Sequence, residues 1–235
     1  MCKPKLYFFP ARRYNKKKGL VKTMLEPKKM YNTKRAEVLI HNLKSRHFDA
    51  YYCATREEAL EKALELIPQG SSVGWGGATS AQQIGLMDAV RRGDYRPIDR
   101  DAAPTPEERE QAMRNCLHAD VFLTGANAIS LDGQMVIIDG MGNRVAAIVY
   151  GPRSVIVVAG INKVVDTLEM AVDRARTVAA PINKQRFPNQ TPCNVTGQCA
   201  DCKAEGCICN QILITRNCRP AGRIKFIIVG EELGF

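Results

Sequence analysis

The chain has 235 residues, of which 45% are hydrophobic and 25% are charged. This is the composition of an ordinary globular protein, and the length suits one α/β domain whose core needs no disulfide bonds. No apolar run approaches the roughly 20 residues that a membrane-spanning helix requires, which excludes a helical membrane protein. We therefore expect a cytoplasmic protein with no membrane partner.

The net charge of +10 is concentrated at the N-terminus. Residues 1–23 carry eight Lys and Arg residues and no acid, so the rest of the chain is nearly neutral. A basic tail can bind nucleic acid or a membrane surface, or it can be a disordered or non-native extension. We favour the extension, expect no nucleic-acid partner, and predict that residues 24–235 form a single domain.

Helices and strands are expected to alternate over the first half of the chain. Helices are predicted at residues 33–46, from Thr55 to Ile67, from Thr79 or Ser80 to Gly93 and from Thr105 to His118, and strands at residues 48–53, 71–75 and 121–123. Strands that alternate with helices in this way pair into a mostly parallel sheet with helices on both faces.

The second half is expected to hold a meander and further strands. Asp132-Gly133 and Asp139-Gly140 each separate short apolar runs, which is turn chemistry and indicates some antiparallel pairing. Strands are predicted at residues 145–149, 155–159, 212–214 and 224–229, a long helix from Asn162 to the residue before Pro181, and a Cys-rich loop over residues 190–218. The predicted fold class is α/β, with a mostly parallel sheet, flanking helices and this C-terminal loop.

A glycine-rich segment, Val73–Ser80, leads from the second predicted strand into a helix. Glycines let the backbone approach a ligand, and a helix N-terminus offers unpaired N–H groups to an anion. Open α/β sheets also bind ligands at the carboxyl ends of their strands. We predict an anion site at Gly76, Gly77, Thr79 and Ser80, with a tight turn that binds nothing as the alternative.

A second segment, residues 124–145, is dense in glycine and polar side chains. Asn127, Asn143 and Arg144 are candidates for binding a small anionic metabolite. Arg144 is the best of them because a guanidinium grips a carboxylate with two hydrogen bonds. The two Asp-Gly pairs could supply a base, but such pairs are typical of turns and we interpret them as turns.

The cysteines are clustered, because six of the nine lie between residues 193 and 218. Without an export signal the compartment is expected to be reducing, where clustered cysteines are more often metal ligands than disulfides. Four thiolates suit either tetrahedral zinc or an iron–sulfur cluster. The predicted ligands are Cys193, Cys199, Cys202 and Cys209. One close pair plus scattered cysteines favours the iron–sulfur cluster, and a loop that binds nothing is the other alternative.

Three further residues receive structural interpretations. Lys163 follows a strand end and could contact an anion, but a lysine at such a position is commonly solvated. Cys53 and Cys116 lie in apolar surroundings and are expected to behave as small hydrophobic residues.

Several of these motifs together resemble the LUD (lactate utilisation) family. The resemblance is carried by residues 73–86, 123–145, 151–152, 155–163 and 227–235, and it covers about residues 28–235. It implies a fold similar to sugar-phosphate isomerases and CoA transferases, and a link to the oxidation of L-lactate to pyruvate beside iron–sulfur and flavin-type partner proteins. It assigns no catalytic residue. The alternative function is a zinc-stabilised isomerase- or transferase-like enzyme acting on a phosphorylated or CoA-linked substrate.

Overall fold

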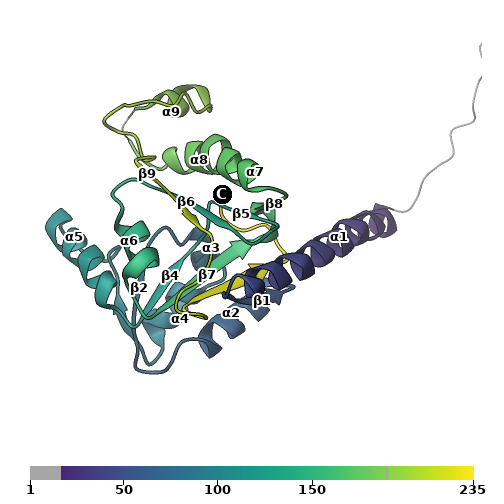
Figure 1. Cartoon of the computed structure of the whole chain (residues 1–235), viewed down its shortest axis with the longest axis horizontal. Helices are drawn as coiled ribbons and strands as arrows, with labels where there is room; N and C mark the ends of the chain where they lie inside the picture. Colours follow the sequence, from purple (N-terminus) through teal and green to yellow (C-terminus); the bar gives the residue numbers. More distant parts are fainter. Residues whose placement is uncertain (1–16, 189) are drawn as a thin grey trace, which may run out of the picture.

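The structure, a computed structural model, describes residues 17–188 and 190–235 and is organised around a six-stranded sheet (Figure 1). The strands of this sheet are β1 (Asp49–Cys53), β2 (Ser72–Trp75), β3 (Arg96–Ile98), β4 (Val121–Thr124), β7 (Ser154–Gly160) and β10 (Ile224–Val229). Their order is β1-β10-β7-β4-β2-β3, and every neighbouring pair is parallel. The predicted α/β class with a mostly parallel sheet is confirmed.

A second, four-stranded sheet lies on one side of the first. It contains β5 (Ala128–Ser130), β6 (Met135–Asp139), β8 (Val164–Val165) and β9 (Gln211–Thr215), in the order β8-β5-β6-β9. The β5–β6 and β6–β9 pairs are antiparallel. The antiparallel pairing expected for the middle of the chain is therefore confirmed.

The layers follow from the alternation of apolar side chains along the strands. Ile156 and Val158 of β7 pack with α2 (Arg56–Glu65), α3 (Thr79–Gln83) and α4 (Leu86–Arg92) on one face of the larger sheet. Val155 and Val157 of the same strand pack with α1 (Lys17–Ser45), α6 (Asn143–Tyr150) and the smaller sheet on the other face.

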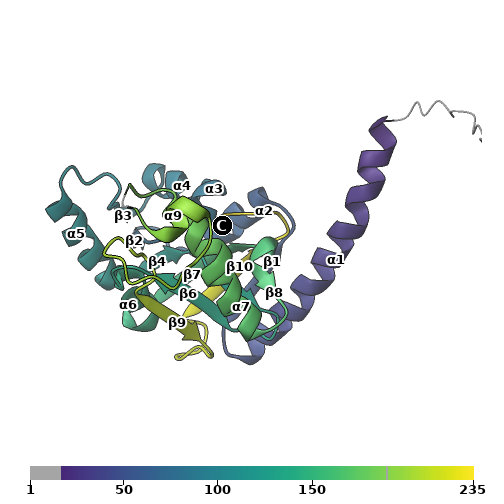
Figure 2. The ribbon, with the colours of Figure 1, turned by 90° about the horizontal axis from the view of Figure 1, so that it is seen from above.

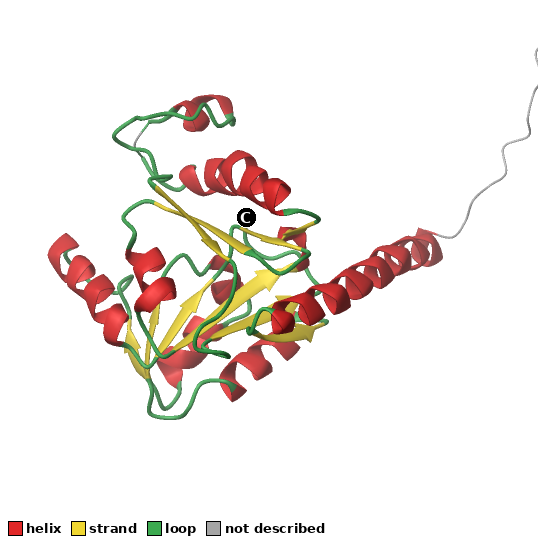
Figure 3. Cartoon of the chain, viewed as in Figure 1, coloured by secondary structure: helices red, strands yellow, loops and turns green. Residues whose placement is uncertain are grey.

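The smaller sheet is covered in turn by a run of helix on its outer face (Figures 1 and 3). This run consists of α7 (Leu168–Arg174), a π-helical turn (Ala175–Ala179) and α8 (Ala180–Lys184). The remaining elements are α5 (Pro106–Asn115), α9 (Pro192–Thr196) and two 3-10 turns, Cys116–His118 and Ile161–Lys163.

Two of the predicted helix starts are confirmed by their caps. The Thr55 side chain accepts a hydrogen bond from the Glu58 backbone N–H at 3.3 Å, and the Thr105 side chain accepts one from Glu108 at 3.2 Å. Each cap satisfies a backbone donor that has no partner within the helix, so α2 and α5 begin where the sequence predicts.

The strand predicted at residues 145–149 is wrong, because this segment is the helix α6. Gly142, at φ +83°, turns the chain, and the Asp139 carboxylate accepts from the Arg144 backbone N–H at 3.1 Å. The helix buries Ala147 and Ile148 and leaves Tyr150 exposed. A short apolar run has no periodicity that distinguishes a strand from a helix, which explains the error.

The long helix predicted from Asn162 is also wrong at its start. Asn162 lies in a 3-10 turn, two residues of β8 follow it, and Thr167 caps α7 by accepting from the Met170 backbone N–H at 3.3 Å. The helix predicted to end at Gly93 is likewise divided into α3 and α4 by Gly85, at φ +80°.

The helix α1 begins at Lys17, inside the predicted extension of residues 1–23; residues 1–16 lie outside the described part of the chain. Figure 2 shows its N-terminal half extending away from the body of the protein. A helix that crosses a bilayer needs about 20 predominantly apolar residues. Among the described residues none qualifies.

Candidate functional site

The carboxyl ends of β2, β4 and β7 meet at one edge of the larger sheet, because these strands are parallel. Gly76 and Gly77 follow β2, and hydrogen bonds tie them to the end of β4. The Gly76 backbone N–H donates to Leu123 at 3.1 Å, and the Thr124 hydroxyl donates to the Gly76 carbonyl at 3.0 Å. The predicted glycine turn is therefore held firmly against the neighbouring strand.

Arg144 reaches this turn from the first turn of α6. Arg144 is only 9% exposed. Its guanidinium donates hydrogen bonds to the carbonyls of Ile138 and Gly77 and to Oδ1 of Asn127. Its Nε atom is buried, has no hydrogen-bond partner among the described residues, and lies 3.9 Å from Oδ1 of Asp139. Burial lowers the pKa of Arg144, because the charged form loses its hydration.

Lys163 brings a second buried cation to the same edge, in the turn after β7. It is 4% exposed, and its Nζ atom donates to Ser80 Oγ at 3.1 Å and to the Ala126 carbonyl at 3.0 Å. Burial, together with the charges of Arg174 and Arg144, lowers the pKa of Lys163 to about 7. A lysine of this kind is characteristic of functional sites.

Arg174 of α7 is the third cation, and Asn127 connects it to the others. The Arg174 guanidinium donates to the Asn127 backbone carbonyl at 2.6 Å, while Asn127 Oδ1 accepts from Arg144 at 3.3 Å and from the Ile138 backbone N–H at 2.9 Å. Burial lowers the pKa of Arg174 as well. Asn127 thus fixes the positions of two arginines at once.

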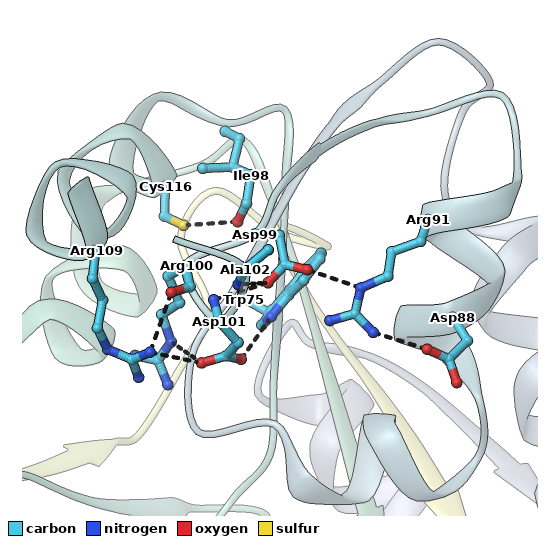
Figure 4. Close-up of polar contacts among 10 residues, drawn as sticks. All are labelled: Trp75, Asp88, Arg91, Ile98, Asp99, Arg100, Asp101, Ala102, Arg109 and Cys116. Atoms are coloured by element: carbon cyan, nitrogen blue, oxygen red, sulfur yellow. Dashed lines mark hydrogen bonds and ion pairs between the residues drawn. The ribbon is translucent and has the colours of Figure 1, made fainter. Parts of the chain in front are cut away.

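A fourth cation, Arg100, belongs to the loop after β3, which closes over Trp75 at the end of β2 (Figure 4). Asp101 of this loop accepts from the Trp75 indole N–H at 3.3 Å and pairs with Arg109 at 3.2 Å. The Arg91 guanidinium lies 5.4 Å from the centre of the Trp75 ring. These contacts hold the loop in place beside the glycine turn.

The Arg100 side chain is largely buried within that loop. Within the part of the chain that the structure describes, its Nε atom has no hydrogen-bond partner, and it lies 3.7 Å from Asp101 Oδ1. Burial lowers the pKa of Arg100, and its positive charge contributes to lowering the pKa of Arg144. The negative charge of Asp139 acts in the opposite direction on the pKa of both arginines.

The structure thus brings Gly76, Gly77, Ser80, Asn127 and Arg144 of the predicted anion site together. Thr79 and Asn143 begin α3 and α6 and are partly exposed, and the hydrogen bonds among the described residues do not involve their side chains. Because α3 has only five residues, its N-terminus adds little attraction for an anion. The side-chain cations carry the site instead.

Three of the cations were not predicted as site residues. Lys163 was interpreted as solvated, but it is buried. Arg174 lies in a segment predicted only as a helix, and Arg100 follows a short strand that the sequence does not signal. The signal available for Lys163 was its place directly after a strand of a parallel sheet, where ligands bind.

A separate cavity of about 190 Å³ lies in the Cys-rich loop, between that loop and α8. Five of the six cysteines between residues 190 and 218 line it: Cys193, Cys199, Cys202, Cys207 and Cys209. Burial and the nearby thiols of Cys207, Cys199 and Cys193 raise the pKa of Cys209 to about 12. The predicted four ligands therefore share one cavity, and Cys207, which was not among the predicted ligands, lies there with them.

The thiols fit a metal centre by their chemistry, because several cysteine ligands suit zinc or an iron–sulfur cluster. Within residues 17–188 and 190–235, however, no three His, Cys, Asp or Glu side chains are already arranged to hold a metal ion. Cys53, Cys116 and Cys218 are buried in the hydrophobic core, away from this cavity.

None of the curated proteins compared with the chain matches it. A DUF162 family protein from Deinococcus radiodurans is similar in structure, with a TM-score of 0.49 and 16% identity over 83% of this chain and 98% of that one. A D-ribose-5-phosphate isomerase in complex with phospho-erythronic acid matches with a TM-score of 0.32 and 19% identity, over 48% of this chain and 54% of that one.

The sequence profile of the LUD domain matches residues 36–229, which include β1 to β10, the glycine turn, all four cations and the Cys-rich loop. The match spans most of the chain, so the chain belongs to the LUD domain family.

Proposed function

We propose that this protein binds a small carboxylate at the carboxyl edge of its larger sheet and takes part in the oxidation of L-lactate to pyruvate. The observation that carries the proposal is the set of buried cations around the glycine turn. Lys163 is 4% exposed and Arg144 9% exposed. Among the described residues, the one carboxylate within ion-pair distance of Arg144 is that of Asp139, 3.9 Å from its Nε atom. An anionic ligand supplies the missing negative charge.

Energetics support a ligand at this place. Burying an ionised side chain without an ion partner costs several kcal/mol, which a fold bears where the charge serves a ligand. A carboxylate accepts hydrogen bonds from two N–H groups of one guanidinium, and the buried Nε atom of Arg144 is a donor without an acceptor. L-lactate and pyruvate both offer such a carboxylate.

A panel of ligands tests this proposal. Thermal unfolding is followed with L-lactate, pyruvate and lactamide, in which a neutral amide replaces the carboxylate. Stabilisation by the two acids and none by the amide is expected, since a ligand that binds only the folded state raises its stability. Equal effects of all three compounds would contradict binding through the carboxylate.

A second function has one observation in its favour. When Lys163 is protonated, it and the three arginines Arg100, Arg144 and Arg174 carry more positive charge than Asp139 and a single bound carboxylate offset. An isomerase- or transferase-like enzyme acting on a phosphorylated or CoA-linked substrate fits this excess. Phosphorylated sugars and CoA thioesters therefore belong in the same panel, and a larger stabilisation by them than by pyruvate selects this alternative.

We also propose that the cavity of the Cys-rich loop holds a metal centre, with an iron–sulfur cluster ahead of zinc. Five cysteines line this cavity, and this supports a metal centre there. An iron–sulfur cluster supplies electron transfer, which would couple the protein to redox partner proteins, whereas zinc supplies a structural link.

Metal analysis decides between the two. Protein purified without oxygen is analysed for iron, zinc and acid-labile sulfide, together with a Cys199→Ser/Cys202→Ser variant and a Cys53→Ala control. Iron with sulfide, lost in the double variant and kept in the control, is expected; zinc without sulfide selects the structural link. The absence of both iron and zinc from the wild-type protein would refute the metal centre.

A further inference from the structure

Lys163 has the hydrogen bonds of a neutral amine. A neutral amine has two N–H groups and one lone pair, and a charged one has three N–H groups. Among the described residues, two acceptors lie within hydrogen-bond distance of Nζ, Ser80 Oγ at 3.1 Å and the Ala126 carbonyl at 3.0 Å. Both N–H groups of the neutral form are thus used, and the lone pair remains for an electrophile.

The charges around Lys163 favour the same state. The groups that act on it are Arg174 and Arg144, both positive, and burial adds to their effect by lowering the pKa to about 7. Neutral lysines next to another cation, in a desolvated place, are the ones that attack carbonyl carbons. At pH 7 the neutral fraction of Lys163 is about a thousandfold higher than that of an exposed lysine.

Ser80 is placed to move protons for such a reaction. It is fully buried, and its hydroxyl accepts a hydrogen bond from Lys163 while keeping a proton of its own to donate. The approach to the amine also lacks side chains, since Gly125 and Gly234 lie next to it; a β-carbon on Gly234 would be 2.7 Å from Nζ and one on Gly125 3.8 Å from it.

We propose that Lys163 is a nucleophile that forms an imine with a small 2-oxo acid, whose carboxylate Arg144 binds. This inference rests on the carboxylate site proposed above and names its substrate class. The amine lone pair attacks the carbonyl carbon and a C–N bond forms, while an amine proton passes through Ser80 to the carbonyl oxygen. The hydroxyl then takes the remaining proton of the nitrogen, again through Ser80, and leaves as water as the C=N bond forms; addition of water reverses the sequence. No oxidant or reductant is consumed.

The last residues of the chain lie next to the amine. Gly234 lies over Lys163, and its backbone N–H donates to Gln83 Oε1 at 2.6 Å. The Leu233 N–H donates to Asn162 Oδ1 at 3.0 Å, and Arg174 donates to the Phe235 carbonyl at 3.4 Å. Because Lys163 is 4% exposed, this segment must move aside before a ligand reaches the amine.

Reductive trapping tests the inference. The full-length protein is incubated with pyruvate and sodium cyanoborohydride, which converts an imine into a stable secondary amine, and the modified lysine is identified by peptide mass spectrometry. We expect Lys163 to carry most of the adduct in the wild-type protein. In Lys163→Met this adduct is absent, in Ser80→Ala it forms at least about tenfold more slowly because the proton relay is lost, and in the control Lys225→Met it is unchanged.

The outcomes separate this inference from the carboxylate site itself. If pyruvate raises the thermal stability and no adduct forms at Lys163, the imine is refuted and the carboxylate site stands. If pyruvate neither stabilises the protein nor labels it, both are refuted. Adducts spread over exposed lysines, equal in wild type and Lys163→Met, also refute the imine.

Discussion

A β-carbon at Gly77 would collide with Nη1 of Arg144, so the guanidinium keeps its position only while residue 77 has no side chain. Gly77 also has φ +57°, a conformation that other L-residues adopt at a cost. The glycine turn after β2 and the arginine of α6 are therefore one unit, although 67 positions separate them in the sequence.

Gly77→Ala is expected to displace the Arg144 guanidinium and weaken carboxylate binding. Part of the loss of stability, about 1–2 kcal/mol, comes from the positive φ alone. Gly70→Ala is the matched control, because Gly70 has φ +73° and no atom within 4 Å of its would-be β-carbon. Urea unfolding measures the free energy of unfolding of both variants, and their carboxylate binding is then compared. Carboxylate binding by Gly77→Ala that equals that of Gly70→Ala would contradict the role of Arg144.

Lys163→Met is expected to change how stability depends on pH. In the folded protein the pKa of Lys163 is lowered to about 7, so between pH 7 and about 10 the unfolded state binds more protons and stability rises with pH. The variant loses this rise and is more stable than wild type below pH 7, by at most about 5 kcal/mol. Unfolding in urea at pH 6 and pH 9 measures it, and a rise of the same size in both proteins would show that Lys163 is not the titrating group.

Asn127→Ala is expected to lower the free energy of unfolding by about 1–3 kcal/mol, because Ile138 N–H and Arg144 lose an acceptor in a buried place. Arg144 also loses a contact that aligns its guanidinium, whereas Arg174 keeps the backbone carbonyl of residue 127, so carboxylate binding weakens through Arg144. Asn143→Ala is the comparison, since the Asn143 side chain has no such role among the described contacts. Equal effects of the two substitutions, measured by urea unfolding and calorimetry, would contradict this account.

Cys209→Ser is expected to remove the metal and Cys207→Ser to retain it, because the predicted ligands are Cys193, Cys199, Cys202 and Cys209. The two cysteines share the cavity, and the Cys209 backbone N–H donates to Cys207 Sγ at 3.4 Å, so the pair makes a close comparison. Metal content per chain measures both variants. If Cys207→Ser loses the metal and Cys209→Ser retains it, the prediction is wrong and Cys207, not Cys209, is the ligand.

The sequence predicts those parts of the fold and site that depend on local patterns. The capping threonines, the parallel strands and the Gly76-Gly77 turn each have their signal within a few residues. Arg144 was also predicted, from the chemistry of its side chain. Its helix was not, because the apolar run after it fits a strand equally well and the Asp139 cap is visible only in the structure.

The rest of the site depends on contacts between distant segments. The burial of Lys163 arises where α3, the end of β4 and the last residues of the chain meet, and no local pattern encodes that meeting. Arg174 and Arg100 join the site from α7 and from the loop after β3 in the same way. The gathering of Cys207 into the cavity likewise follows from the loop's path rather than from its spacing.

The most direct test of the central claim is a calorimetric titration of pyruvate and L-lactate into wild-type protein, Arg144→Gln and Arg153→Gln. Arg153 is exposed and serves as the matched control. The account predicts binding to wild type and Arg153→Gln, and a loss of at least about tenfold in affinity for Arg144→Gln, since a charge-assisted hydrogen-bonded pair contributes about 1.5–3 kcal/mol. Affinity for both acids that is the same in all three proteins would contradict it.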